Sequence, residues 1–225
     1  MRMPASTIAI DGPAASGKST LAQRLASRLG YLLFDTGVMY RAVTLAAIRR
    51  GLDLNSEEDL GGLAETASLD VRPPSVPDGR GCDVLLDGED VTGEIRSSPV
   101  DQAVSQVSSY ARVRQAMTLR QREIGARGRV VMVGRDIGTI VMPDADLKIY
   151  LDASPEVRAW RRVRQGEGRE TYGATLEAIR RRDDMDSSRA VAPLRPAQDA
   201  QILNTSELTI EDVLDWALRL ARTDP

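Results

Sequence analysis

The chain has 225 residues, of which 42% are apolar and 28% are charged, and its formal net charge is −3. These values are ordinary for a soluble globular protein and argue against bulk electrostatic binding to nucleic acid or to an anionic membrane. With one cysteine, Cys82, and no histidine, an internal disulfide is excluded and a zinc site is disfavoured. No uninterrupted apolar run of about 18 residues occurs, so we expect neither a signal peptide nor a membrane span, and a cytoplasmic location.

The N-terminal part of the chain alternates between short apolar runs and amphipathic helical patterns. An apolar run at 7–11 predicts a buried strand, and apolar side chains on one face of 17–29 predict a helix that ends at Gly30. A second apolar run at 31–34 is followed by a helical pattern at 38–50. This strand–helix–strand–helix order is typical of the start of a parallel α/β sheet.

The stretch between the first strand and the first helix matches the motif G-x-x-x-x-G-K-[ST] from Gly12 to Ser19. In this motif backbone N–H groups surround phosphate oxygens, and the following helix points its positive end at the same anion. We expect Lys18 to contact the transferred phosphate and the Ser19 hydroxyl to ligate Mg²⁺. The predicted ATP-binding residues are Gly12, Pro13, Ala14, Ala15, Ser16, Gly17, Lys18, Ser19 and Thr20.

The middle of the chain is more polar and richer in proline and glycine than the segment before it. Residues 55–69 are polar but compatible with a helix, and residues 72–81 are so rich in proline and glycine that they cannot form a central strand. The dipeptide Asp87-Gly88 between apolar residues predicts the turn of a small hairpin. We therefore expect residues 60–98 to form a small insertion at the edge of the core.

The second half of the chain returns to helices that alternate with apolar strands. The patterns predict a long helix at 99–126, strands at 130–133, 145–151 and 200–203, and helices at 155–165, 175–186 and 210–221. Five strands alternating with helices, with a phosphate loop after the first, are typical of a doubly wound α/β fold with a parallel sheet. We predict that residues 1–225 form a single domain of this class.

A missing motif and the placement of the arginines limit which classes of phosphate-loop protein fit this sequence. A GTP-binding switch is disfavoured because no N-K-x-D segment occurs, and the D-x-x-G match at 59–62 lies in a polar stretch. Five arginines lie in or just after segments that would face the C-terminal edge of the sheet: Arg41, Arg114, Arg135, Arg182 and Arg189. Beside a phosphate loop they are typical of clamps for a second phosphorylated substrate.

Several motifs make the sequence recognisable as a whole. Besides the phosphate loop, it contains D-T-G-V-M-Y-R at 35–41, S-Q-V at 105–107, G-R-D-I-G-T at 134–139 and R-D-D-M-D-S-S-R at 182–189. Together these motifs closely resemble the bacterial cytidylate kinases, and the likeness runs from about residue 7 to residue 220. The phosphate loop alone is generic, whereas the other motifs in combination are specific.

The resemblance implies transfer of the γ-phosphoryl group of ATP to CMP or dCMP in pyrimidine nucleotide metabolism, with Mg²⁺ and without a covalent intermediate. The CMP-binding residues that it implies are Thr36, Tyr40, Arg41, Ser105, Arg114, Arg135, Asp136, Arg182, Asp186 and Arg189. Arg41, Arg135 and Arg189 would hold the acceptor phosphate. Tyr40, Arg182 and Asp186 would meet the sugar. Ser105, Arg114 and Asp136 would read the cytosine edge.

The resemblance also implies a mobile lid at 155–172, and it makes the insertion at 60–98 the monophosphate-binding region. We expect at least one of the lid arginines Arg158, Arg161 and Arg162 to reach the ATP phosphates when the lid closes. The residues expected to act in catalysis are Lys18, Arg135, Arg189, Arg158 and Arg162. The sequence departs from the family pattern at Thr36, where serine is frequent, and at Trp160 among the lid arginines.

The sequence leaves other functions possible. A UMP/CMP, adenylate or shikimate kinase would share the scaffold, and a non-catalytic ATP-dependent regulatory module would need the loop and Lys18 but no clamp arginines. A nucleic-acid-binding protein agrees poorly with a pI of about 5.2. We expect ATP and CMP or dCMP as ligands, no nucleic acid or membrane partner, and a monomer.

Overall fold

The structure is a computed structural model that describes residues 5–164, 171–188 and 192–222. The chain forms two compact units. The first unit comprises Met1–Tyr31 and Arg129–Pro225, and the second comprises Leu32–Gly128.

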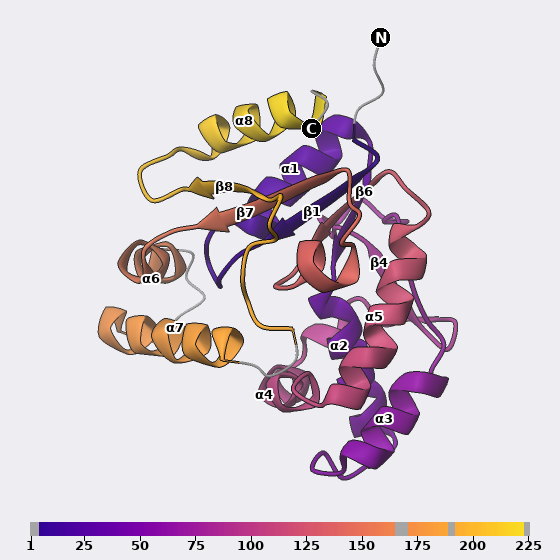
Figure 1. The fold of residues 1–225 in the computed structure, drawn as a ribbon. Helices are drawn as coiled ribbons and strands as arrows, with labels where there is room; N and C mark the ends of the chain where they lie inside the picture. Colours follow the sequence, from indigo (N-terminus) through magenta and orange to yellow (C-terminus); the bar gives the residue numbers. More distant parts are fainter. Residues whose placement is uncertain (1–4, 165–170, 189–191, 223–225) are drawn as a thin grey trace. The chain divides into compact units, whose positions relative to one another are not determined.

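The first unit contains most of the central sheet, and Figure 1 colours its elements by their position in the sequence. Its elements are β1 (Thr7–Asp11), α1 (Lys18–Leu29), β6 (Val130–Val133), the π-helix η2 (Ile137–Val141), β7 (Leu147–Asp152), α6 (Pro155–Arg164), α7 (Tyr172–Ser187), β8 (Gln201–Asn204) and α8 (Ile210–Arg222). Helix α1 packs against α8, and α6 packs against α7.

The central sheet has the strand order β2-β6-β1-β7-β8, with β2 at Leu32–Asp35. Strand β1 runs parallel to both β6 and β7, and β7 runs parallel to β8. In β1, Ile8, Ala9 and Ile10 are completely buried, as expected for an apolar strand between two others. The predicted five-stranded α/β sheet with a loop after its first strand is confirmed.

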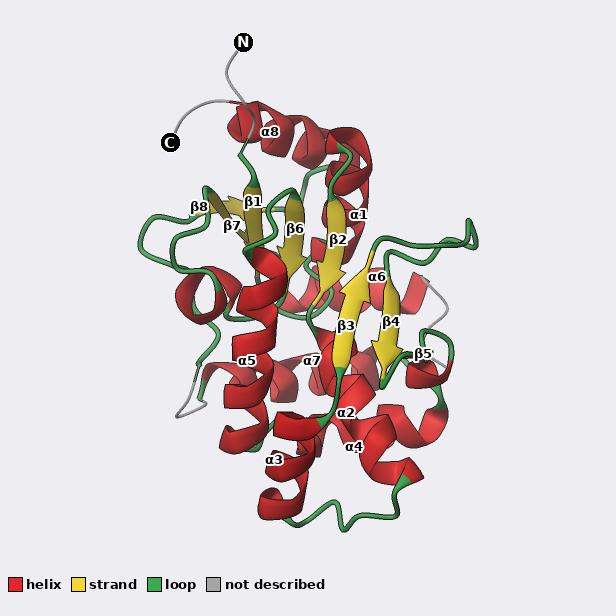
Figure 2. Cartoon of the chain, turned by 90° about the vertical axis from the view of Figure 1, so that its right-hand side faces the viewer, coloured by secondary structure: helices red, strands yellow, loops and turns green. Residues whose placement is uncertain are grey.

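The second unit is mainly helical, with a small sheet that Figure 2 shows beside β2 in the cartoon. Its elements after β2 are α2 (Gly37–Arg49), α3 (Glu57–Thr66), β3 (Leu69–Arg72), β4 (Asp83–Leu86), β5 (Glu89–Asp90), the 3₁₀ helix η1 (Glu94–Arg96), α4 (Ser98–Val107) and α5 (Ala111–Gly125). Strands β3, β4 and β5 form an antiparallel sheet. The predicted hairpin is confirmed, because Asp87 and Gly88 connect β4 to β5 with φ values of 51° and 87°.

The prediction of one long helix at 99–126 is wrong. The structure has two helices, α4 and α5, which are separated at 108–110. The hydroxyl groups of Ser108 and Ser109 donate to the carbonyl oxygens of Ser105 and Gln106, 3.1 and 2.7 Å away. Serine side chains that bond to nearby backbone in this way compete with continuation of a helix, and Tyr110 is already extended.

Two further elements were not predicted. Strand β3 follows α3 after a break at Ala67; it begins at Leu69, where the helix-compatible segment 55–69 ends. The π-helix η2 directly follows Asp136, where the sequence predicted no regular element. Single-turn π segments are frequent at functional sites.

Candidate active site

The predicted phosphate loop occupies the turn between β1 and α1. Gly12 has a φ of 143°, and a Cβ there would overlap the carbonyl oxygen of Leu151, so this position accepts only glycine. Gly17 has a φ of 100° and caps α1, whose first turn carries no acidic residue. The positive end of the helix is therefore available to an anion.

Lys18 curls back over the loop. It is 6% exposed, and its Nζ donates to the carbonyl oxygen of Pro13 at 2.6 Å. Ser16 is completely buried, and its Oγ has no hydrogen-bond partner among the described residues. A buried hydroxyl is normally paired, so an oxygen of a bound phosphate would satisfy it.

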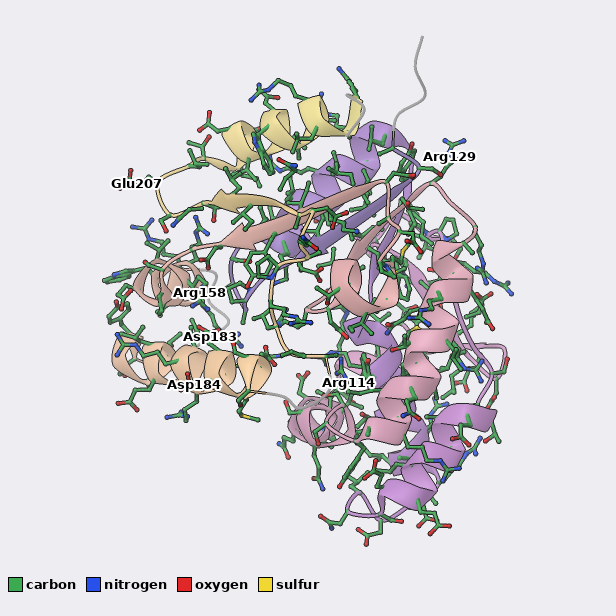
Figure 3. The ribbon with its side chains drawn as sticks, viewed as in Figure 1. Arg114, Arg129, Arg158, Asp183, Asp184 and Glu207 are labelled. Atoms are coloured by element: carbon green, nitrogen blue, oxygen red, sulfur yellow. The ribbon has the colours of Figure 1, made fainter. Side chains whose placement is uncertain are left out.

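Arg158 supports the loop from α6. Its guanidinium group donates to the carbonyl oxygens of Ala14 and Ala153, at 3.2 and 2.8 Å, and forms a two-point ion pair with Asp183 on α7. Figure 3 labels Arg158 and Asp183 where α6 and α7 lie side by side. Arg158 is 2% exposed, and its guanidinium group is occupied by backbone carbonyl oxygens and by Asp183. That at least one of the lid arginines reaches the ATP phosphates on closure stays a prediction.

Arg161 supports the next part of the loop. Its guanidinium group donates to the carbonyl oxygen of Ser16 at 3.4 Å, and to Oγ1 and the carbonyl oxygen of Thr205 at 3.0 and 2.5 Å. Thr205 Oγ1 also donates to the carbonyl oxygen of Ser16 at 3.1 Å. Burial lowers the pKa of Arg161, yet a guanidinium group keeps its charge at neutral pH.

Arg158 and Arg161 lie outside the phosphate loop and donate to the carbonyl oxygens of Ala14 and Ser16, whereas the donor to Pro13 is Lys18 of the loop itself. A carbonyl that is held by a donor outside the phosphate site cannot turn its negative end toward a phosphate. The loop backbone is therefore set for an anion before any ligand binds.

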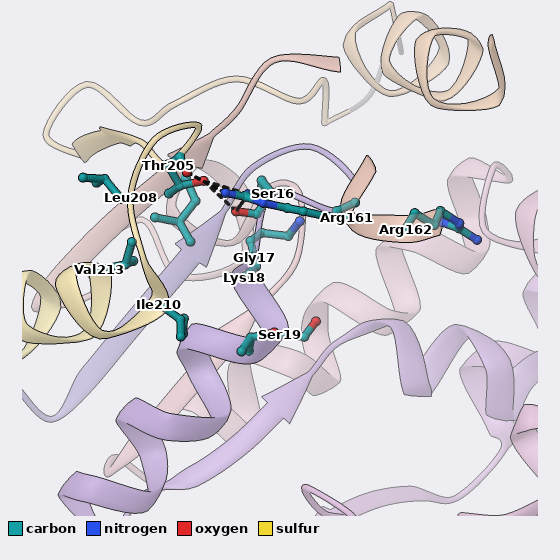
Figure 4. A pocket seen from close by; sticks show the side chains of 13 residues that line it. Ser16, Gly17, Lys18, Ser19, Arg161, Arg162, Thr205, Leu208, Ile210 and Val213 are labelled. Atoms are coloured by element: carbon teal, nitrogen blue, oxygen red, sulfur yellow. Dashed lines mark hydrogen bonds between the residues drawn. The ribbon is translucent and has the colours of Figure 1, made fainter. Parts of the chain in front are cut away.

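The loop forms one wall of a cavity of about 440 Å³ (Figure 4). Arg161 and Arg162 contribute to its polar lining, together with the loop from Ala15 to Thr20. Leu208, Ile210 and Val213 supply an apolar part of the lining. The combination of a phosphate-binding wall and an apolar wall suits a nucleotide.

A second group of predicted residues lies after β6. Arg135 donates from Nε to Oδ2 of Asp186 on α7 at 2.9 Å, and Asp186 is 2% exposed. Asp136 is buried directly before η2. The two backbone N–H groups that follow, from Ile137 and Gly138, donate to the carboxylate of Asp11 at the end of β1.

Five of the predicted acceptor residues lie in the second unit. The guanidinium carbon of Arg114 lies 5.6 Å from the centre of the Tyr40 ring, within the range of a cation–π contact. Arg41 forms an ion pair with Asp101 and donates to the carbonyl oxygen of Ile95 at 3.2 Å. Ser105 is exposed on α4, and Thr36 is buried at the start of α2.

A family model described as cytidylate kinase matches residues 8–223. The chain belongs to the cytidylate kinase family. It is 52% identical over 213 residues to a cytidylate kinase of Chloroflexus aggregans, covering 93% of this chain and 90% of that protein. It is 50% identical over 213 residues to a cytidylate kinase of Rhodococcus jostii, covering 92% of this chain and 90% of that protein.

Solved structures agree on the fold. A gluconokinase from Sinorhizobium meliloti superimposes with a TM-score of 0.51 at 13% identity, covering 98% of this chain and 93% of that chain. At this identity the similarity shows the fold alone.

Within this cytidylate kinase family member, each unit brings some predicted residues together. The first unit joins Arg135 to Asp186, and the second joins Tyr40 to Arg114. Arg182 lies exposed on the same helix as Asp186. The predicted residue Arg189 and part of the predicted lid, 165–170, lie outside the described residues.

Sequence reasoning missed several residues that shape the site. Asp183 and Thr205 hold Arg158 and Arg161, and Asp11 holds the backbone after Asp136. The signal for Asp11 was its place at the end of the predicted strand 7–11, immediately before Gly12. Nothing in the local sequence pairs Arg158 with Asp183, because they lie on different helices.

Proposed function

We propose that this chain transfers the γ-phosphoryl group of ATP to CMP or dCMP, giving ADP and CDP or dCDP. The observation that carries the proposal is the phosphate loop, whose Ala14 and Ser16 carbonyl oxygens are held by Arg158 and Arg161, beside a cavity of about 440 Å³ that Lys18 lines. Membership of the cytidylate kinase family supports the identity of the acceptor.

The chemistry of phosphoryl transfer agrees with the residues present. This reaction needs alignment and charge neutralisation rather than a protein nucleophile. The chain has no histidine, and burial raises the pKa of the Cys82 thiol to about 11, which leaves it protonated at neutral pH. Neither a nucleophile nor a histidine base is required from the protein.

On the donor side, the ATP phosphates would lie on the loop and Lys18, with the nucleoside against Leu208, Ile210 and Val213. At least one of the three lid arginines is expected to meet the phosphates, and two of them, Arg158 and Arg161, bind the loop backbone in this structure. We therefore assign the phosphate contact to Arg162, which lines the cavity. Arg158 and Arg161 would act by holding the loop.

The donor set near the loop suits Mg²⁺ that arrives with the nucleotide. Among the described residues, no group of three or more carboxylate, cysteine or histidine side chains could hold a metal ion. Mg²⁺ in kinases is often held by substrate phosphates, water and few protein ligands, so the Ser19 hydroxyl in the cavity wall is a suitable single ligand. The ion would neutralise charge on the donor phosphates.

On the acceptor side, the roles implied by the family likeness remain our proposal. Arg41, Arg135 and Arg189 would bind the acceptor phosphate, and Tyr40, Arg182 and Asp186 the sugar. Ser105, Arg114 and Asp136 would bind the base. The ion pair of Arg135 with Asp186 joins a phosphate residue to a sugar residue, and the contact of Arg114 with Tyr40 joins a base residue to a sugar residue. Both contacts support the proposal that these residues bind neighbouring parts of one ligand.

We also propose that the protein acts as a cytoplasmic monomer with residues 60–98 as its monophosphate-binding region and 155–172 as its lid. No helix among the described residues has the length and apolar character of a membrane span. The pI of about 5.2 supports small-molecule substrates over nucleic acid.

The function is tested by measuring ADP formation from ATP with CMP, dCMP, UMP, AMP and shikimate in separate reactions. We expect rapid turnover with CMP or dCMP and slow turnover with the others. Equal or faster turnover with UMP, AMP or shikimate would assign a different acceptor, and ADP release that does not depend on an acceptor would indicate an ATPase.

Base selection should depend on Asp136. An ionised carboxylate accepts a hydrogen bond from the cytosine amino group but repels the corresponding oxygen of uracil. In Asp136→Asn the amide can donate to that oxygen, so we expect the CMP-to-UMP ratio of kcat/KM to fall at least about 10-fold, or about 1.4 kcal/mol of discrimination. If both substrates slow equally and the ratio holds, Asp136 only braces Arg135.

A further inference from the structure

Asp11 connects two parts of the first unit that bind different substrates in the proposed function. It is the last residue of β1 and directly precedes Gly12 of the phosphate loop. Its Oδ1 accepts the backbone N–H of Ile137 at 2.8 Å, and its Oδ2 accepts that of Gly138 at 2.7 Å. These two N–H groups follow immediately after Arg135 and Asp136.

The contact is buried and tightly packed. Asp11 is 4% exposed. A Cβ added at Gly138 would lie 3.3 Å from Asp11 Oδ2 and 3.2 Å from Lys148 Cδ, which is closer than ordinary contact. The absence of a side chain at Gly138 therefore lets the backbone approach the carboxylate.

The charge of Asp11 weakens the fold at neutral pH. Burial raises its pKa from 3.8 to about 6, with a smaller contribution from Asp136, although the two backbone hydrogen bonds and Lys18 lower it. Burial raises the pKa of Tyr150 on the neighbouring strand, and the charges of Asp152 and Asp11 add to this rise. Because the folded pKa is raised, the stability that Asp11 contributes is complete below pH 3.8 and is lost as the pH rises through about 6. A residue placed for stability alone would gain from being uncharged here.

We propose that Asp11 is a positioning residue that fixes the backbone after Arg135 and Asp136 to the strand leading into the phosphate loop. This inference rests on the proposed function, because it treats Arg135 and Asp136 as acceptor-binding residues. The carboxylate accepts one N–H group on each of its two oxygens, whereas an amide of the same size has only one acceptor oxygen. It thereby sets the direction in which Arg135 and Asp136 leave β6.

The direct test is Asp11→Asn. An asparagine oxygen can accept one N–H, but its NH₂ group faces the other N–H, so one hydrogen bond to a charged group is lost. We expect kcat/KM for CMP to fall roughly 10-fold or more, mainly through KM for CMP, while the Kd of ATP changes by less than about 3-fold. Asp146→Asn is the matched control, because Asp146 accepts the backbone N–H of Thr7 at the opposite end of β1.

A second readout does not depend on catalysis. In the wild type, the amide resonances of Ile137 and Gly138 should titrate with a midpoint near pH 6, and their hydrogen exchange should quicken several-fold or more in Asp11→Asn. If the wild type did not phosphorylate CMP, the proposed function would be wrong. The titration and hydrogen exchange of these two amides would still show whether Asp11 positions the backbone.

If Asp11→Asn does not fold, Gly138→Ala provides a second test, because the added methyl group would lie 3.3 Å from Asp11 Oδ2 and strain the same contact. A smaller rise of KM for CMP, with unchanged ATP affinity, is expected there. The proposal is overturned if KM for CMP and the two amides behave as in the wild type, or if Asp146→Asn produces the same loss.

Discussion

Replacing Lys18 with alanine is expected to lower kcat roughly 10²–10⁴-fold, the loss typical of removing one preorganised charged donor at a transition state. The ammonium group is buried in the loop, 2.6 Å from the Pro13 carbonyl oxygen, and would exchange this partner for a phosphate oxygen. The fold should persist, because the carbonyl oxygens of Ala14 and Ser16 keep their own donors. Steady-state kinetics with ATP and CMP, alongside thermal melting, measure both effects.

The chain offers a matched control for Lys18. Its other lysine, Lys148, pairs with Asp199 at 2.6 Å outside the phosphate loop. Lys18→Arg should lose most activity because a planar guanidinium group does not replace a compact ammonium group in this loop. Lys148→Arg should keep wild-type kcat. A Lys18→Ala variant with more than half of the wild-type kcat would remove Lys18 from the mechanism.

The second large effect concerns the ion pair of Arg158 and Asp183. Arg158→Ala leaves Asp183 without its partner and the carbonyl oxygens of Ala14 and Ala153 without their donor. Loss of one partner of a fully buried pair costs about 3–5 kcal/mol. Because the Asp183 side chain is 23% exposed, we expect a loss of about 2–3 kcal/mol in the free energy of unfolding. The Kd of ATP should also rise about 10-fold, since the Ala14 carbonyl oxygen becomes free to turn.

The same two helices provide the control for this prediction. Arg180 on α7 pairs with Glu156 on α6 at 2.8 Å, and both side chains are about half exposed. Arg180→Ala should therefore change stability by less than about 1 kcal/mol and leave ATP affinity unchanged. Denaturant unfolding and calorimetric ATP titration separate the two variants. Equal behaviour of Arg158→Ala and Arg180→Ala would show that the buried pair does not support the loop.

The elements predicted well from the sequence are those whose pattern depends on local burial. Strands β1 and β6 begin and end where predicted, because continuous apolar runs mark strands that are covered on both faces. Gly30 ends α1 in the left-handed conformation that favours glycine, with a φ of 67°. The helix at 99–126 failed because its apolar spacing continues through 108–110, where serine hydroxyl groups end α4.

The phosphate loop was predictable as a motif, but the role of each arginine was not. The spacing of Arg158, Arg161 and Arg162 on one helix says that they are close together, not which of them is buried. Asp183 and Thr205, which decide this, come from α7 and from the loop after β8. Charged pairs between distant segments leave no periodic signal in a single sequence.

The most direct test of the central claim is the identity of the product formed from ATP and CMP. Phosphorus NMR of the reaction mixture distinguishes the β-phosphate of CDP from inorganic phosphate. The account predicts CDP and ADP in equal amounts, with both formed at least about 100-fold more slowly by Lys18→Ala. Release of inorganic phosphate with ADP and without CDP would contradict it.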